Sequence, residues 1–302
     1  MSLRNDSDAR RYLDPLTLSK IRNMELISRF AVQGFFQGLH KSPFYGLSVE
    51  YSDHRPYIQG DEIKFIDWKA YARTDHLNIK RFRQETNVQC HLLIDTSESM
   101  GYGSGAVRKI DYACYLAAAL TYLMLLQNDG VGLVLFNERI RVRIPAKSQG
   151  NQLHPILLAL SHITPELKTD IPSALHQVAD SVTRRGIIIL ISDLINDPDE
   201  VIRGLSHLRH MKHDVIVFQV LDDSELQLNF SDMTEFRDSE SDARLRVFPE
   251  SIRDEYQARV AAFVENYRQA CGRGEIDFCG LNTSTPLDRA LLTYLERRRN
   301  LL

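Results

Sequence analysis

The sequence lacks the features that mark a secreted, disulfide-stapled or membrane-spanning protein. Its 302 residues include only four cysteines, and none of these forms a CxxC pair, which argues against a thiolate zinc site and against a disulfide framework. We therefore expect buried thiols in a reducing compartment. The N-terminus is polar where a secretory signal is apolar. The longest apolar stretch, residues 113–126, is shorter than the roughly 20 residues that span a bilayer, so we expect a cytoplasmic chain with no membrane span.

An excess of positive charge is also missing. The chain carries 37 Lys and Arg against 40 Asp and Glu, a net charge of −3. This balance argues against a nucleic-acid binder that is held by phosphate contacts. Residues 55–81 are basic and aromatic, but four acidic residues interrupt them. We interpret this segment as a structural collar that can also serve as a docking surface.

Motifs that bind nucleotide phosphates are not present either. The sequence holds no GxxxxGK[ST] pattern, so it encodes no nucleotide hydrolysis of the P-loop kind. The glycine-rich segment 101–105 has the spacing GxGxG, whereas the dinucleotide fingerprint is GxGxxG directly after a strand. We therefore do not interpret this segment as a nucleotide site.

What the sequence does show, from residue 88 onward, is an alternation of strand and helix patterns. Short apolar runs predict strands at 88–95, 131–136, 186–191, 214–221 and 276–281. Helical patterns fill 109–127, 151–163, 171–184, 198–210, 251–271 and 286–298. Residues 139–144 alternate like an edge strand. Strands that alternate with helices imply βαβ units, and therefore an α/β fold with a doubly wound, mostly parallel sheet and one antiparallel edge strand.

The chain divides into an extension and a main domain. Residues 1–85 predict an amphipathic helix over 15–39 followed by the irregular collar, packed on the main domain. Residues 86–302 form the main domain. Two alternating segments near 225–248 predict a small hairpin inserted into it.

Oxygen-bearing side chains gather where ligands bind in such a sheet, beyond the carboxyl ends of the strands. Asp95, Ser97 and Ser99 form a D-x-S-x-S pattern after the first strand of this domain, and alternate residues of an extended loop point to one side. Thr169 precedes a predicted helix, and Asp193 follows the central strand. These hard oxygen ligands suit Mg²⁺, Mn²⁺ or Ca²⁺.

The charge of this set indicates an open site. Two carboxylates only neutralise a divalent cation, and the three hydroxyls add ligands without charge. We expect such a site to be weak alone and to keep an electrophilic position that a carboxylate of another molecule can fill. This is the arrangement of a metal-bridged adhesion site and not of a closed structural site.

The same residues resemble the metal-ion-dependent adhesion site of von Willebrand factor type A domains. This resemblance implies the metal ligands Asp95, Ser97, Ser99, Thr169 and Asp193.

The segment upstream resembles a second, more specific pattern. The signature of the bacterial domain-of-unknown-function family 58 is similar to RPYIQGDEIKFIDWKAYARTDHLNIKRFRQE. The later segments VIVFQVLDDSELQLNF and TSTPLDRALLTYL also resemble that family, so the likeness covers about residues 35–297. One departure is Leu194, which follows the metal-site aspartate where many adhesion sites have glycine.

The resemblance implies a function in protein–protein interaction. It implies a soluble adaptor. We expect this adaptor to use Mg²⁺ and not to be an enzyme. The implied partner is a MoxR-type AAA+ ATPase, or the client protein of that ATPase, in chaperone-like maturation or assembly of other proteins.

Other interpretations stay open. A metal-dependent hydrolase would use the same oxygen cluster, with Asp222 and Asp223 as the only candidate general bases. A purely structural domain would leave the site unoccupied, and the D-x-S-x-S turn would then cap the next helix. His207, His210 and His213 are spaced for zinc, but histidines near a helix C-terminus are also favoured by the helix dipole.

Overall fold

The computed structural model describes residues 14–21, 23–39, 54–56, 68, 71, 77–80, 88–148, 150–237 and 244–299. The chain divides into two compact units. The larger unit contains residues 1–41 and 87–302, and the smaller unit contains residues 42–86.

The larger unit is built on one six-stranded sheet with the strand order β10-β7-β6-β3-β4-β5. The strands are β3 (Gln89–Asp95), β4 (Gly130–Phe136), β5 (Ile140–Lys147), β6 (Ile187–Ser192), β7 (Asp214–Leu221) and β10 (Asp277–Asn282). All neighbours pair in parallel except β5, which runs antiparallel to β4 at one edge. The predicted fold class is therefore confirmed, including the antiparallel edge strand.

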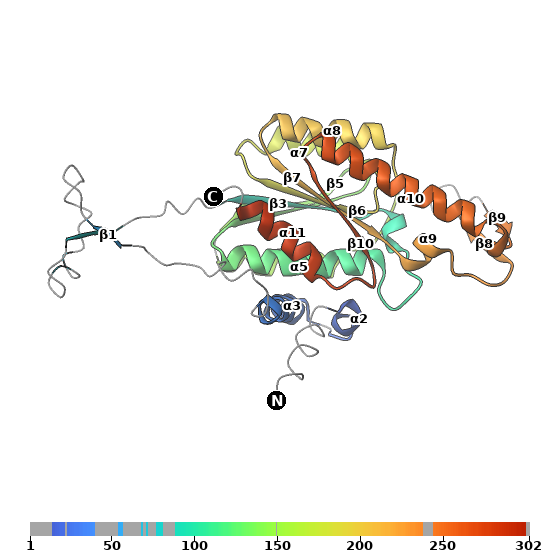
Figure 1. Ribbon diagram of the computed structural model, residues 1–302, viewed down its shortest axis with the longest axis horizontal. Helices are drawn as coiled ribbons and strands as arrows, with labels where there is room; N and C mark the ends of the chain where they lie inside the picture. Colours follow the sequence, from blue (N-terminus) through green and yellow to red (C-terminus); the bar gives the residue numbers. More distant parts are fainter. Residues whose placement is uncertain are drawn as a thin grey trace. The chain divides into compact units, whose positions relative to one another are not determined.

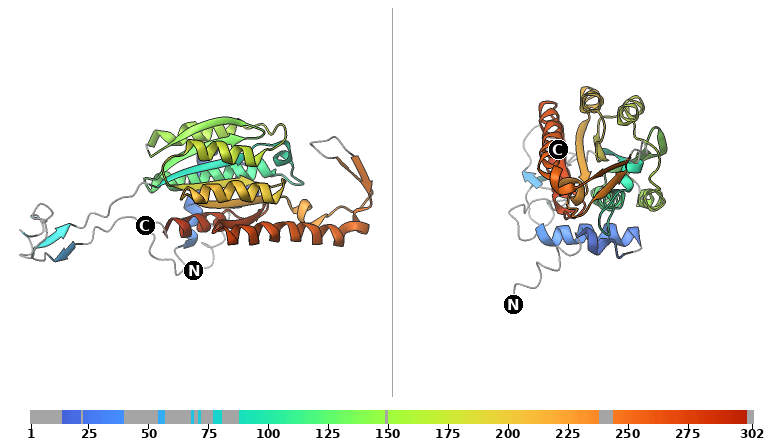
Figure 2. Two further views of the ribbon diagram at one scale, coloured as in Figure 1. Left: turned by 90° about the horizontal axis from the view of Figure 1, so that it is seen from above. Right: turned by 90° about the vertical axis from the view of Figure 1, so that its right-hand side faces the viewer.

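Helices cover both faces of this sheet (Figures 1 and 2). The helices are α5 (Lys109–Leu126), α6 (Leu153–Ser161), α7 (Ile171–Ser181), α8 (Pro198–His210), α10 (Pro249–Arg273) and α11 (Asp288–Arg299). One core contains residues of α7, α8 and the C-terminal part of α10 packed on the sheet. On the other side, α5 contacts the sheet together with α6 and α11. Because both faces are covered, β6 is buried along its whole length, as its apolar sequence predicts.

Helix α5 is apolar on all sides because it is covered on all sides. It contacts β3, β4 and β7 on one side and α3 (Met24–Leu39) on another. By length and composition it is also the one described helix that could cross a membrane, but 72% of its residues are buried inside the fold. Packing accounts for its composition, as expected of a core helix.

The N-terminal extension differs from the predicted single helix over 15–39. It forms a short helix α2 (Pro15–Leu18) and then α3. The local signals explain the break: Asp14 caps α2 by accepting a hydrogen bond from the Thr17 backbone, and Asn23 accepts from the backbone N–H groups of Glu25 and Leu26 at the start of α3. The apolar spacing is the same in both helices, so it did not reveal the break that the capping residues make between them.

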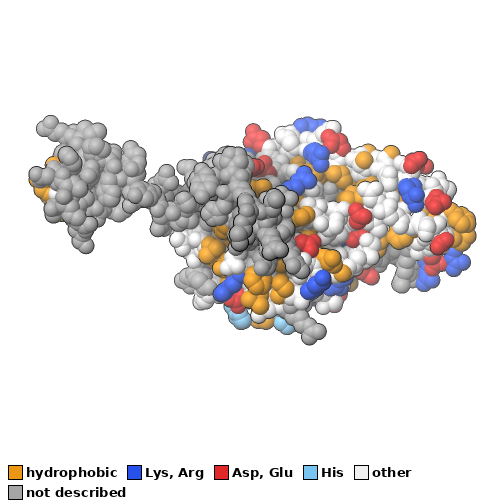
Figure 3. Space-filling view, turned by 60° about the horizontal axis from the view of Figure 1, so that its bottom comes forward, with side chains coloured by type: hydrophobic (Ala, Val, Ile, Leu, Met, Phe, Trp, Pro, Cys, Tyr) orange, Lys and Arg blue, Asp and Glu red, His pale blue; other side chains and the backbone are white. Residues whose placement is uncertain are grey.

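The insert differs from the prediction in its first segment. The expected strand LQLNF, residues 226–230, is not a strand: its first two residues end the short helix α9 (Asp223–Gln227), which a capping box between Asp222 and Glu225 starts and a left-handed Leu228 ends. The hairpin pairs β8 (Thr234–Arg237) with β9 (Arg244–Val247). It lies at the N-terminal end of α10, where exposed apolar side chains gather at the right-hand end of Figure 3; they are Met233, Leu245 and Phe248.

The smaller unit holds a two-stranded antiparallel pairing of β1 (His54–Pro56) with β2 (Asn78–Lys80). Trp68 and Tyr71 make an edge-to-face ring contact, with centroids 6.2 Å apart. Most of the expected collar lies outside the described residues, so its packing on the main domain stays a prediction. The four cysteines, all in the larger unit, are buried and form no disulfide, as expected.

His91, near the start of the inner strand β3, makes stability depend on pH. Burial, with nearby His213 and Arg143, lowers the pKa of His91 from 6.5 to about 4. The unfolded chain therefore binds a proton first, so the stability that neutral His91 contributes is present above pH 6.5 and is lost as the pH falls toward 4. We expect wild-type protein to lose about 1–2 kcal/mol more than His91→Gln between pH 7.5 and pH 5. Urea unfolding of both proteins at the two pH values measures this difference, and parallel pH curves would contradict it.

Candidate functional site

The candidate site lies at the carboxyl edge of the sheet, where the neighbouring strands β3 and β6 end. Asp95 ends β3 and is fully buried. Its Oδ1 accepts a hydrogen bond of 2.9 Å from the backbone N–H of Ser97. Its Oδ2 accepts hydrogen bonds from the hydroxyls of Ser192, at 2.7 Å, and Thr169, at 3.2 Å. One carboxylate thus joins three segments that are far apart in the sequence.

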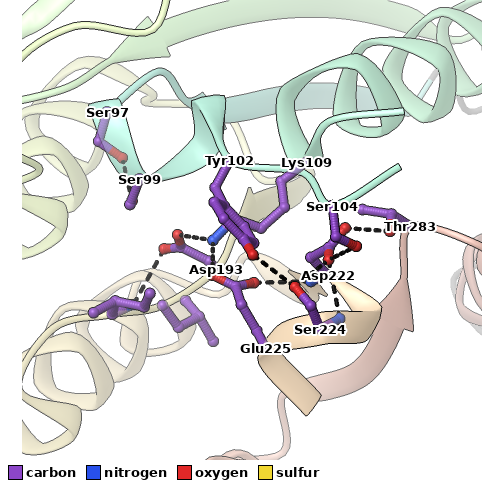
Figure 4. A network of polar contacts seen from close by, with 12 residues as sticks. Ser97, Ser99, Tyr102, Ser104, Lys109, Asp193, Asp222, Ser224, Glu225 and Thr283 are labelled. Carbon is purple, nitrogen blue, oxygen red and sulfur yellow. Dashed lines mark hydrogen bonds and ion pairs between the residues drawn. The ribbon is translucent and has the colours of Figure 1, made fainter. Parts of the chain in front are cut away.

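The two serines of the D-x-S-x-S pattern face each other. Ser97 is extended, and a 3₁₀ turn over Glu98–Gly101 follows it. The hydroxyl oxygens of Ser97 and Ser99 lie 3.1 Å apart (Figure 4). Glu98 is exposed, and its backbone N–H donates to the carbonyl of Leu167 at 2.9 Å. This hydrogen bond ties the serine turn to the segment that carries Thr169.

Helix caps fix the other two loops. Asp170 caps α7 by accepting from the Ser173 backbone N–H, which holds the preceding Thr169 at the sheet edge. Asp193 follows β6 and is fully buried, and its Oδ1 accepts from the Ile195 backbone N–H at 3.2 Å. The structure therefore brings all five predicted side chains to one edge of the sheet.

The unusual Leu194 has a backbone conformation that glycine adopts more readily than leucine. Its φ angle is 61°, in the left-handed region that favours glycine. Its side chain is fully buried in the core, and its backbone N–H donates to Ser192 Oγ while its carbonyl accepts from Tyr267 Oη. Burial and these hydrogen bonds offset the cost of the conformation, so the departure leaves the loop intact.

The sequence pattern did not predict the part played by Lys109. This first residue of α5 has a fully buried side chain, and its ammonium donates to Asp193 Oδ2 at 2.9 Å and to Glu225 Oε1 at 2.7 Å. Figure 4 shows the ammonium between the two carboxylates. The only sequence signal is a lysine at the start of an otherwise apolar helix, which by itself is typical of a solvent-facing end.

Charge dominates the chemistry of this cluster. Burial and the neighbouring Asp193 raise the pKa of Asp95 from 3.8 to about 6. Burial alone would lower the pKa of Lys109, but the attraction of Asp193 and Glu225 outweighs it and raises that pKa. With all groups ionised, three carboxylates and one ammonium leave a net charge of −2 in a buried space.

A second polar network lies beside the first (Figure 4). Asp222 accepts hydrogen bonds from Ser104 Oγ, from Thr283 Oγ1 at 3.0 Å, and from both the backbone and the hydroxyl of Ser224. Burial would raise its pKa, but these hydrogen bonds outweigh burial and lower the pKa of Asp222. A carboxylate that is saturated with donors and has a lowered pKa makes a poor general base, which removes one support of the hydrolase interpretation.

The three histidines do not meet. The ring of His207 lies 5.6 Å from that of His176, whereas His213 is buried near His91. His210 is exposed. Among the described residues, histidine, cysteine and acidic side chains form no group of three suited to a metal. In the Asp95 cluster, hydroxyl oxygens are among the proposed metal ligands, so the absence of such a group does not bear on that cluster.

Comparisons with known proteins place this chain in a family. The model of a protein family described as "Protein of unknown function DUF58" matches residues 53–265. Uncharacterized proteins of Mycobacterium bovis (Mb1516) and Mycobacterium tuberculosis (Rv1480) are 27% identical over 265 residues, which cover 86% of this chain and 81% of theirs.

Solved structures share the fold at low sequence identity. BatB from Bacteroides thetaiotaomicron is 17% identical, with a TM-score of 0.51 over 70% of this chain and 99% of its own. An aerotolerance-related membrane protein from Bacteroides fragilis is 18% identical, with the same TM-score and coverage. The VWA domain of SpRpn10 is 12% identical, with a TM-score of 0.39 over 68% of this chain and 94% of its own. The chain belongs to the DUF58 family, and its larger unit shares an α/β fold with BatB.

Proposed function

We propose that this protein is an interaction domain that binds its partner through a divalent cation. The cation is held by Asp95, Ser97, Ser99, Thr169 and Asp193. The observation that carries the proposal is the meeting of these oxygen-bearing side chains, from three separate segments, at the carboxyl edge of the sheet. That edge is where ligands bind in doubly wound folds.

The donor set fits a hard divalent cation. Two oxygens that bind one Mg²⁺ at right angles, each at about 2.1 Å, lie about 3.0 Å apart. The hydroxyl oxygens of Ser97 and Ser99 have this spacing, 3.1 Å. The net charge of −2 in the cluster also matches one divalent cation. When bound, Mg²⁺, Mn²⁺ or Ca²⁺ supplies an electrophilic position for an incoming carboxylate.

The chain's own residues do the rest. Asp95 holds Ser97 and Thr169 in place through hydrogen bonds. Lys109 fixes Asp193 on its inner side, which leaves the hydroxyls as the neutral face of the site. The hydroxyls bind the cation without adding charge, and an acidic residue of a partner supplies a further oxygen ligand.

We extend this proposal to the partner and the compartment. The likeness to family 58 supports a cytoplasmic adaptor for a MoxR-type AAA+ ATPase or its client, in maturation or assembly of other proteins. Affinity capture from the native cell, with and without EDTA, tests it. We expect an ATPase with a GxxxxGK[ST] motif to be retained in Mg²⁺ and released by EDTA, and retention that EDTA does not change would contradict the cation bridge.

Cation binding should also stabilise the isolated protein. A ligand at about 100 times its dissociation constant adds about 2.7 kcal/mol to the free energy of unfolding, so saturating Mg²⁺ should raise Tm by several degrees. Ser99→Ala removes one proposed ligand and should weaken this shift. Ser104→Ala is the matched control, because Ser104 lies in the same loop but bonds to Asp222. Equal Mg²⁺ shifts in Ser99→Ala and wild-type protein would contradict the assignment.

A further inference from the structure

Three exposed apolar side chains stand on the loops that carry the proposed metal ligands. Leu167 precedes Thr169 by two residues, Ile195 follows Asp193 by two, and Tyr102 follows Ser99 by three. Their exposed fractions are 47%, 49% and 40%. We call these three residues the apolar rim.

Each member is tied to the site by a direct contact. The Leu167 carbonyl accepts from the backbone N–H of Glu98, within the serine turn. The Ile195 backbone N–H donates to Asp193 Oδ1. The Tyr102 ring centroid lies 5.9 Å from the ammonium of Lys109, and the two side chains are neighbours in Figure 4. The apolar rim is therefore held by the same elements that position the oxygen cluster.

Leu167 is the member that folding explains least. Its φ angle is 64°, in the left-handed region that asparagine and glycine adopt readily and leucine does not. Leu194 and Leu228 also have positive φ angles, but both are buried, so packing compensates them. Among the described residues, Leu167 alone combines a positive φ angle with an exposed apolar side chain. A polar residue would suit the position better if stability were its only role.

The structure assigns the apolar rim to partner recognition. We propose that it contacts a segment of another protein that presents one carboxylate with apolar side chains within two positions of it. This inference rests on the proposed function, because the cation supplies the positive charge that selects the carboxylate. Apolar contacts around a central charge exclude water from it, as in the centre of protein interfaces, and removing water strengthens the attraction between cation and carboxylate.

The test is a selection of peptides by the full-length protein in Mg²⁺. Panning a phage-displayed library of random dodecapeptides should enrich sequences in which an acidic residue has Leu, Ile, Val or Phe within two positions. An enriched peptide, made synthetically with a fluorophore, then gives a Kd by fluorescence anisotropy. We expect Leu167→Asn and Ile195→Asn each to raise this Kd about tenfold.

The stability of Leu167→Asn separates recognition from a structural role. Asparagine adopts the left-handed conformation more easily, so the Tm of Leu167→Asn should stay the same or rise while peptide binding weakens. Leu126→Asn is the matched control, because Leu126 has a similar exposed fraction, 50%. It is the last residue of α5, whereas Lys109 at the site is the first. Its Kd for the peptide should not change.

The outcomes that contradict the inference distinguish the apolar rim from the cation bridge. Acidic peptides that bind Leu167→Asn and Ile195→Asn as tightly as wild-type protein would overturn the role of the apolar rim and leave the cation bridge standing. Apolar peptides that bind equally in EDTA would overturn the cation bridge and retain the rim as a docking surface. No enriched peptide, or binding only to a second copy of the chain or to phosphatidylcholine vesicles, would overturn the partner assigned here.

Discussion

Replacing Lys109 with methionine is expected to lower the free energy of unfolding by about 3–5 kcal/mol, measured by urea denaturation in EDTA at pH 7.5. The ammonium is fully buried and bonds to Asp193 and Glu225. Methionine keeps much of the volume of the side chain but none of its charge. Asp193 and Glu225 would then remain buried without a positive partner, with Asp95 close by. Removing one member of a buried charge cluster costs far more than removing an exposed ion pair.

The same variant should respond strongly to a divalent cation. Because Mg²⁺ would supply positive charge next to Asp193, the deficit of Lys109→Met should be smaller in Mg²⁺ than in EDTA. Lys147→Met is the control, since Lys147 is exposed at the end of β5, and exposed substitutions usually stay within about 0.5 kcal/mol. A Lys109→Met protein as stable as wild type in EDTA would show that the cluster does not depend on this ammonium.

Local sequence patterns were enough for the sheet and for the loops of the site. The helix Pro198–His210 and the strand Asp214–Leu221 begin and end where apolar spacing and capping residues place them. The loops carrying Asp95 and Asp193 could be placed together because parallel strands expose their carboxyl ends at one edge. Side-chain chemistry at those ends therefore predicts a candidate site from the sequence alone.

Contacts between distant residues could not be predicted in the same way. Lys109 is 84 residues from Asp193 and 116 from Glu225, so nothing near it in the chain distinguishes a buried lysine from an exposed one. The predictions that were wrong have a different cause, which is short polar signals within apolar patterns. Asn23 divides the N-terminal helix, and the capping box at Asp222 turns an alternating segment into helix α9. Apolar periodicity reports burial well, but capping hydrogen bonds decide where an element starts.

Asp95→Asn should separate the folding role of the site from its binding role. Asparagine keeps the shape of the side chain and can still accept from the Ser97 backbone, while the hydroxyls of Ser192 and Thr169 can rotate to accept from its amide. It carries no charge, however, and a divalent cation held by hydroxyls and a single remaining carboxylate, Asp193, binds weakly. We therefore expect the Mg²⁺-induced rise in Tm and the EDTA-sensitive capture of a partner both to be lost.

In EDTA, by contrast, Asp95→Asn should gain stability even though it loses cation binding. Burial raises the pKa of Asp95 from 3.8 to about 6, so a proton favours the folded state, and that stability is lost as the pH rises through 6. At pH 7.5 the wild-type protein without cation bears the full cost, which the neutral amide avoids. We expect Asp95→Asn to be more stable than wild type by about 1–3 kcal/mol in EDTA and less stable, or equal, in saturating Mg²⁺. Urea unfolding under the two conditions measures both signs. A variant that is less stable than wild type in EDTA would contradict this expectation, because it would show that the hydrogen bonds of ionised Asp95 outweigh the cost of burying its charge.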